Sequence, residues 1–330
     1  MGLKANGNYR SPRAIRYSAC RVKIVLSCFL LIACSGDAEY KPINFSEKMN
    51  VDKPIAQKNY RPVLRVAVAA MISPKETSIY YQELIDYLAA KIEHEAELTQ
   101  RKTYGEVNEL LTKRQIDLAF ICTGPFATGA DRYGIEAIAT PIVRGRPFYH
   151  AYLIVNNNSD LQSLADLEGK DFAFTDPESN TGSLVPRYWL SQIGATPETF
   201  FRSFTYTYSH DNAIMAVAKN LVDGAAVDGH MWEYYQQRNP FYSSKTRVIK
   251  KSEPFGSPPL VVSKALDPGM KSTLKRMILS MHMDPEGKRI LDELMIDYFA
   301  APESEWYAPV KAMRERVTTE GKMDNASQKS

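Results

Sequence analysis

Hydrophobic positions in residues 62–313 fall into short apolar runs separated by longer amphipathic stripes. The apolar runs predict buried strands at 64–69, 116–121, 171–175 and 224–227. Apolar side chains recur every four residues from Tyr80 to Ile92, which predicts a helix. Further helices are expected near 183–193, 210–220, 268–281 and 285–294. Strands that alternate with helices favour α/β lobes with mostly parallel sheets.

The first 33 residues follow a different pattern. A basic stretch ending at Lys23 precedes a mostly apolar run from Ile24 to Ala33. A bilayer span needs about 20 apolar residues, so this run is too short and is typical of a secretory signal. The sequence Ala33-Cys34-Ser35 resembles a bacterial lipobox, in which the cysteine is lipidated. An ordinary cleaved signal with a chance cysteine is the alternative. We expect a signal at 1–33, lipidation of Cys34 and a flexible tether at 34–61.

Charge and cysteine content change this picture only slightly. The chain has 41 Lys and Arg against 38 Asp and Glu, but residues 1–33 contain six basic and no acidic residues. The remainder is mildly acidic and lacks the basic surface expected of a nucleic-acid-binding protein. Of the four cysteines, Cys20 and Cys28 lie in the expected signal, and Cys34 would be acylated. Cys122 alone would remain, so no intrachain disulfide is expected.

Four loops follow the predicted strands, at the sheet edge where α/β proteins bind ligands. They span 71–78, 122–126, 176–183 and 228–230, and none is rich in Lys or Arg. In the third loop, Ser179, Asn180 and Thr181 precede a predicted helix. Helix capping needs one such residue, whereas three suggest hydroxyl and N–H donors that converge on an anion.

A histidine marks the start of another predicted helix. His210 follows Tyr208 and Ser209, which places its imidazole near the first free N–H groups of that helix. There it could donate a hydrogen bond to an oxyanion. A capping or exposed histidine is an equally good interpretation of the sequence.

Several motifs occur in the order found in a known family. They are Asp176-Pro177, Ser179-Asn180-Thr181-Gly182, Ser209-His210-Asp211 and Val222 to Asp228. With these motifs, residues 63–313 resemble the periplasmic phosphate/phosphite/phosphonate-binding proteins of ABC importers. The resemblance implies a two-lobed periplasmic-binding-protein fold of type II, with crossing strands near 150–160 and 248–260. We therefore expect lobe one at 62–155 plus 256–313, lobe two at 156–255 and a frayed polar tail at 314–330.

The resemblance also implies which residues contact the ligand. In lobe two these are Ser179, Asn180, Thr181, His210 and Asp228, and in lobe one Tyr81 faces them. We add the hydroxyl-bearing loop residues Ser78 and Thr123 of lobe one. At two positions the chain differs from the usual sequence of the family. These differences bear on the substituent of the ligand more than on its anionic group. The chain has Ser-Asn-Thr-Gly where phosphonate binders usually have Ser-Thr-Ser-Gly, and Cys122 where an aromatic residue is common.

Other classes of function have weaker support. The chain has no Gly-x-Ser-x-Gly or His-Glu-x-x-His motif, and nothing in the sequence pairs Cys122 with a base. A metal site formed by His210, Asp211, Asp228 and His230 is possible in principle, but the chain has five histidines in all. We expect neither an enzyme nor a cofactor or metal.

The expected protein is a lipid-anchored solute-binding protein of the periplasm or cell surface. It would capture a small tetrahedral oxyanion between its lobes for an ABC permease. A ligand-binding sensor lipoprotein that is not coupled to transport is the alternative.

Overall fold

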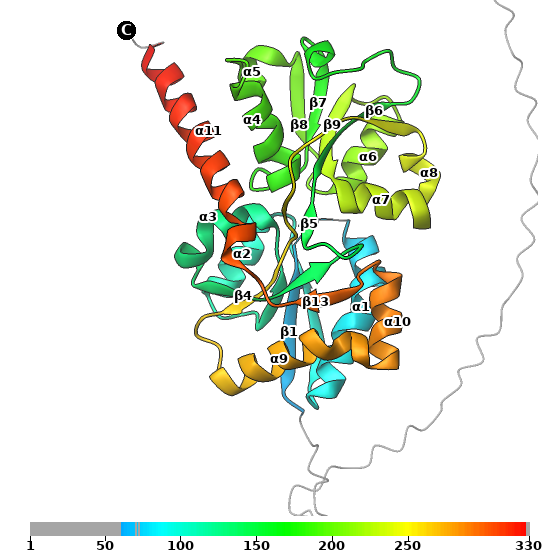
Figure 1. Cartoon of the computed structure of the whole chain (residues 1–330), viewed down its shortest axis with the longest axis vertical. Helices are drawn as coiled ribbons and strands as arrows, with labels where there is room; N and C mark the ends of the chain where they lie inside the picture. Colours follow the sequence, from blue (N-terminus) through cyan, green and yellow to red (C-terminus); the bar gives the residue numbers. More distant parts are fainter. Residues whose placement is uncertain (1–60, 70, 72, 328–330) are drawn as a thin grey trace, which may run out of the picture. The chain divides into compact units, whose positions relative to one another are not determined.

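The computed structural model describes residues 61–69, 71 and 73–327, and it contains two sheets joined by a short two-stranded ribbon (Figure 1). The predicted signal, Cys34 and nearly all of the predicted tether lie outside the described residues. Among the described residues, no helix combines the length and apolar character that a membrane crossing requires.

The first sheet has six strands in the order β13-β4-β12-β3-β1-β2. These strands are β1 (Val63–Val68), β2 (Glu95–Gln100), β3 (Leu118–Phe120), β4 (Ile135–Ile142), β12 (Leu260–Ser263) and β13 (Tyr298–Ala300). The helices of this lobe are α1 (Pro74–Lys91), α2 (Tyr104–Thr112), α3 (Thr123–Tyr133), α9 (Pro268–Ser280) and α10 (Pro285–Glu293), with 3-10 turns at Met281–Met283 and Ser304–Trp306.

The second sheet has five strands in the order β10-β6-β9-β7-β8. They are β6 (Ala151–Asn156), β7 (Asp171–Phe174), β8 (Ser203–Tyr206), β9 (Gly224–Asp228) and β10 (Thr246–Lys251). The helices of this lobe are α4 (Val185–Ser191), α5 (Pro197–Phe200), α6 (His210–Ala218), α7 (Gly229–Arg238) and α8 (Pro240–Ser243), with a 3-10 turn at Ala165–Leu167 and a π-helical turn, η2, at Asn180–Leu184. The four predicted strands and the predicted helices are confirmed.

Both sheets are mixed, whereas the sequence predicted mostly parallel ones. In the first sheet β1 pairs in parallel with β2 and β3, but β12 is antiparallel to β3 and β4. In the second sheet β7 pairs in parallel with β8 and β9, but β6 is antiparallel to β9 and β10. Strands β6 and β12 each come directly after a passage of the chain between the lobes. The passage therefore reverses the strand direction and makes these two strands antiparallel to their neighbours.

The lobe boundary also differs from the expected one. The two passages pair as an antiparallel ribbon of β5 (Phe148–Tyr149) and β11 (Phe255–Gly256). The second passage lies where it was expected, but the first is earlier than 150–160. Strand β6, which the sequence assigned to lobe one, belongs to the second sheet. Only one residue separates β5 from β6, so the apolar run does not show where the chain leaves the first lobe and enters the second.

The C-terminal residues form a helix instead of a frayed tail. Helix α11 (Ala308–Ser327) contacts α3 of the first lobe and α4 of the second (Figure 1). Val310 and Met313 are buried with Trp189 and other apolar side chains of the second lobe. Packing of this apolar face supports the helix, which the polar composition of residues 315–330 did not indicate.

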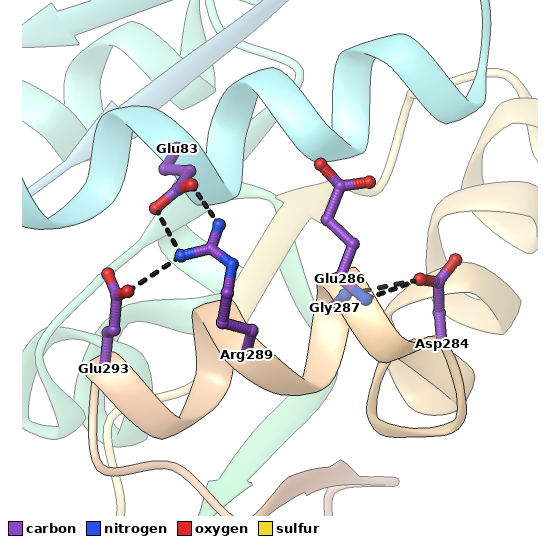
Figure 2. Close-up of polar contacts among 6 residues, drawn as sticks. All are labelled: Glu83, Asp284, Glu286, Gly287, Arg289 and Glu293. Atoms are coloured by element: carbon purple, nitrogen blue, oxygen red, sulfur yellow. Dashed lines mark hydrogen bonds and ion pairs between the residues drawn. The ribbon is translucent and has the colours of Figure 1, made fainter.

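Helix α10 is fixed to α1 by polar contacts. Arg289 binds Glu83 of α1 and lies 2.7 Å from Glu293, one turn along its own helix (Figure 2). At the start of α10, the Asp284 carboxylate accepts the N–H groups of Glu286 and Gly287 at 3.0 and 3.4 Å (Figure 2). These contacts fix α10 beside α1 and cap its start, and the turn that follows α10 reaches the pocket described below.

Candidate functional site

The starts of two helices from opposite lobes meet beside the ribbon. The N–H of Asn180, the first residue of η2, donates to Sγ of Cys122, the N-cap of α3, at 3.5 Å. A Cβ atom at Gly124 would lie 2.5 Å from the carbonyl oxygen of Glu178, so this close approach requires glycine. Helix N-termini expose free N–H groups and carry partial positive charge, so this junction favours an anion.

Buried polar atoms without a hydrogen-bond partner gather around this junction. Among the described residues they include Tyr104 Oη, Thr175 Oγ1, Asn180 Oδ1, Thr181 Oγ1 and Ser183 Oγ. A buried polar group without a partner costs about 1–3 kcal/mol, and native proteins contain few of them. Their presence on and around one turn of helix indicates a surface built to bind a polar ligand.

Two tyrosines extend the junction. The N–H of Tyr104, the first residue of α2, donates to the Asp176 carboxylate at 3.0 Å, which ties this tyrosine to the second lobe. The hydroxyl of Tyr149, in the ribbon, accepts from Nδ2 of Asn180 at 3.1 Å. Burial raises the pKa of both tyrosine hydroxyls well above its ordinary value. Both therefore stay protonated, and Tyr104 can donate to a ligand.

His210 is a buried, neutral donor. It is 1% exposed, and its Nδ1 accepts the N–H of Asp228 at 3.0 Å, so the ring proton is on Nε2. Burial lowers the pKa of His210 to about 3, so the ring is neutral at physiological pH. The hydrogen bond from Tyr208 N–H to the Thr175 carbonyl, at 3.1 Å, joins the loop before α6 to the loop before η2. The structure excludes the exposed histidine that the sequence left open.

Asp228 ends β9 and caps α7. Its carboxylate accepts the N–H groups of His230 and Met231 at 2.8 and 3.2 Å. Burial raises the pKa of Asp228 to about 7 in spite of these two bonds. Its negative charge contributes to the raised pKa values of Tyr81 and Cys122. Asp228 thus changes its protonation near neutral pH in the middle of the site.

The predicted site residues fall into two groups. Ser179, Asn180, Thr181, His210 and Asp228 are all buried on the second-lobe side of the junction. The hydroxyl of Ser179 acts as a helix cap, because it accepts Gly182 N–H at 3.0 Å.

The lobe-one residues contribute less to the junction. The ring of Tyr81 lies edge-on to Phe120, with ring centroids 5.0 Å apart, and lines a neighbouring pocket. The hydroxyl of Thr123 donates to the Gly256 carbonyl at 2.8 Å, so its proton is already used. Ser78 is exposed on α1 and does not line the pocket.

Sequence reasoning missed four polar residues of the junction: Tyr104, Tyr149, Thr175 and Ser183. Tyr104 lies within a capping box in which Thr103 and Glu106 bond each other, and this pattern could have marked the start of α2. Ser183 belonged to the predicted loop but was not among the residues expected to bind the anion. Thr175 and Tyr149 end or join strands, and their hydroxyls reach the junction only because of the tertiary fold.

The arrangement favours binding over catalysis. Burial raises the pKa of the Cys122 thiol to about 12, so it is not a reactive thiolate. Asp211, which the sequence offered as a candidate metal ligand, accepts the N–H of Ser73 at 3.0 Å. In the part of the chain that the structure describes, no group of three or more His, Cys, Asp or Glu side chains is placed to hold a metal ion.

Comparison with known proteins places the chain in a family. The family model described as "ABC transporter, phosphonate, periplasmic substrate-binding protein" matches residues 66–307. The phosphonates-binding periplasmic protein of Escherichia coli K12 is 26% identical over 64% of this chain and 63% of its own length. A probable ABC transporter phosphite-binding protein of Prochlorococcus marinus is 24% identical over 51% of this chain and 61% of its own length. The chain thus spans less than two thirds of the length of these two relatives.

The fold agrees with this placement. The structure of PhnD1 from Prochlorococcus marinus in complex with methylphosphonate has a TM-score of 0.69 and 20% identity, and covers 78% of this chain and 98% of that chain. At this identity the likeness establishes the fold alone, which is the two-lobed α/β fold of periplasmic binding proteins. The family match over most of the chain establishes more: the chain belongs to the phosphonate-type periplasmic substrate-binding proteins of ABC transporters.

Proposed function

We propose that this protein binds a tetrahedral phosphorus oxyanion, of the phosphonate, phosphite or phosphate type, between its lobes and delivers it to an ABC permease. The observation that carries the proposal is the set of five buried, unpartnered polar atoms around η2. Relatives named for phosphonate and phosphite binding, and a relative of the same fold that holds methylphosphonate, support the choice of anion.

The proposed binding uses neutral donors. Thr181, Ser183 and Tyr104 would donate hydroxyl protons, and His210 would donate from Nε2. These groups stand beside the free N–H groups of helix N-termini, which supply the favourable field without a formal cation. In a buried site, hydrogen bonds to a charged ligand contribute more than bonds between neutral groups.

Asp228 would add a proton requirement. An ionised carboxylate beside a fully ionised anion is repulsive, so the pair should share at least one proton. Because the pKa of Asp228 is near 7, binding should weaken as the pH rises above neutrality. A ligand that binds as a mono-anion, or that shares a proton with Asp228, should show this dependence of affinity on pH. A ligand that binds equally well in all its protonation states should not.

A thermal-shift screen tests the proposal. The purified chain is heated with phosphate, phosphite, methylphosphonate or sulfate at equal ionic strength. A ligand at about 100 times its dissociation constant stabilises a protein by about 2.7 kcal/mol, which gives a clear rise in melting temperature. We expect at least one phosphorus oxyanion to stabilise the protein more than sulfate. No response to any phosphorus oxyanion, up to millimolar concentration, would contradict the proposal.

We also propose that Cys34 is lipidated and holds the protein at the membrane, in the periplasm or at the cell surface. The support is the apolar run Ile24–Ala33 followed directly by Cys34. The variant Cys34→Ser should leave the membrane fraction or fail to mature. Normal processing and full membrane association of this variant would contradict the lipidation.

A further inference from the structure

A second surface of the site is mainly apolar. A pocket beside the junction is lined by apolar or aromatic side chains, among them Tyr81, Phe120, Met231 and Phe299, and by only four residues with charged or ring-nitrogen groups: Arg144, Asp228, His230 and Glu233. The residues with unpartnered polar atoms around η2 do not line it. The pocket and the donor cluster are therefore two separate surfaces.

Two residues connect the surfaces. Asp228 and Met71 both line the pocket. Their main chains also hold His210, because Asp228 N–H donates to its Nδ1 at 3.0 Å and the Met71 carbonyl accepts its N–H at 2.9 Å. A ligand whose anionic group lies against His210 thus has the wall of the pocket directly beside it.

The charged groups of the pocket already have partners within the protein. Glu233 accepts from Arg144 at 2.7 Å and from the hydroxyl of Tyr152. Asp228 accepts two N–H groups of α7. Burial lowers the pKa of His230 to about 4, so this ring is uncharged. What remains for a ligand to contact is mainly the apolar lining, together with the side chains of three tyrosines.

The rim of the pocket has an unusual backbone. Arg144 and Met295, which both line the pocket, have φ values of 52° and 57°, in the left-handed region that favours glycine. Met295 follows the end of α10, where glycine is the common residue. The bond from Ile296 N–H to the Leu291 carbonyl, at 2.9 Å, holds this turn. A large apolar side chain thus occupies a strained position at the pocket, as is common at ligand sites.

We infer that the ligand is an organophosphonate with an apolar alkyl or aryl substituent, which fills this pocket while the phosphonate group lies at the donor cluster. The inference rests on the proposed function and narrows it. Phosphate, phosphite and methylphosphonate have no group long enough to cover the apolar lining. A short substituent with an ammonium group would bring a charge into apolar surroundings where the carboxylates are already bonded.

Calorimetry with a ligand series tests the inference on the unmodified protein. The series contains methyl-, propyl-, butyl- and 2-aminoethylphosphonate. Each buried methylene should tighten binding about fourfold, so butylphosphonate should bind about 60-fold more tightly than methylphosphonate. Propylphosphonate should also bind more tightly than 2-aminoethylphosphonate, which has nearly the same length.

The outcomes separate the inference from the proposed function. Equal affinities along the alkyl series, or a preference for the aminoethyl compound, would overturn the apolar substituent and leave phosphorus oxyanion binding intact. Failure of every compound to bind, together with phosphate and phosphite, would overturn both.

A pocket-filling variant gives an independent test. Met231→Trp adds bulk in the pocket, and Gln237→Trp makes the matched change at an exposed position of the same helix. The ratio of butylphosphonate to methylphosphonate affinity should fall from about 60 towards one in Met231→Trp. It should stay near the unmodified value in Gln237→Trp. A ratio that is unchanged in Met231→Trp would overturn the assignment of the pocket to the substituent.

Discussion

In this site one hydrogen bond joins a buried histidine to the backbone of a buried aspartate, and burial shifts the pKa values of the two side chains in opposite directions. His210 becomes harder to protonate, with a pKa of about 3, and Asp228 becomes harder to ionise, with a pKa of about 7. Both shifts favour neutral groups, which suits the proposed binding of an anion through neutral donors. A protonated histidine would have given attraction, but its burial without a partner is unfavourable.

The raised pKa of Asp228 makes a prediction for stability. Between the ordinary value of 3.8 and about 7, folded Asp228 holds a proton that the unfolded chain has released. The contribution of Asp228 to the free energy of unfolding therefore falls as the pH rises through that window. Asp228→Asn cannot ionise and still provides a good helix cap, so the variant should gain stability relative to the unmodified protein as the pH rises from about 4 to 8.

Urea unfolding of both proteins at pH 5 and pH 8 measures this difference. Other titrating groups are common to the two chains and cancel. A stability difference that is the same at both pH values would show that Asp228 is ionised in the folded protein.

Individual residues of the site were predictable where local sequence determines their role. Ser179, Asn180 and Thr181 form a run of capping residues, and their burial at a helix start follows from that pattern. Tyr104 was not predictable in the same way. It follows β2, whose alternating charged residues are only partly buried, and no apolar run marked this strand or the loop after it.

At the scale of elements, the π-helical turn η2 is the critical unit. It opens with the Ser179 cap and presents Thr181 and Ser183, and Gly182 lies between them against the side chain of Thr175. A Cβ atom at Gly182 would overlap Thr175, so glycine is required for the turn to pack on the end of β7. The sequence predicted a helix here but not its wider first turn, because that turn depends on this packing.

The variant Gly182→Ala should therefore lower stability by about 1–3 kcal/mol, as overpacked buried sites usually do, and should also weaken ligand binding. Gly105→Ala is the matched control, because its Cβ would meet nothing closer than 3.8 Å. Denaturant unfolding gives the stabilities. Comparable stability in the two variants would mean that the turn tolerates a side chain and that its shape is not set by Thr175.

The local hydrophobic pattern also fails to predict the structure where the chain passes between the lobes. Residues 148–156 form one nearly continuous hydrophobic segment, but β5 pairs with β11 and β6 pairs with β9 and β10. Both strands are extended and apolar, so only their partners distinguish them. The same holds for α11, whose stability comes from contacts with both lobes and not from its own composition.

At the scale of the whole molecule, hydrogen bonds cross between the lobes on more than one side of the site. Asp176 accepts Tyr104 N–H, and Glu178 accepts Nδ2 of Asn108 at 3.1 Å and the hydroxyl of Tyr133 at 3.2 Å. Near the pocket, further bonds run from Ser73 N–H to Asp211 and from Arg144 to Glu233. The structure thus represents a closed arrangement, in which donors from both lobes surround the proposed anion site.

If the ligand stabilises this arrangement, the protein should become more compact on binding, because a ligand favours the state it binds better. Small-angle scattering should give a smaller radius of gyration with saturating methylphosphonate than without it. A sulfate sample at equal ionic strength is the control. Tight binding without compaction would contradict closure of the lobes on the ligand.

The central claim is that one phosphorus oxyanion is held by hydroxyl donors of both lobes. Calorimetric titration of methylphosphonate into Thr181→Ala, from the second lobe, and Tyr104→Phe, from the first, tests it most directly. The exposed Thr205→Ala is the control. A hydrogen bond to a charged group contributes about 1.5–3 kcal/mol, so each site variant should bind about 10- to 150-fold more weakly, and the control should bind normally. Unchanged affinity in both site variants would place the anion elsewhere and contradict the account.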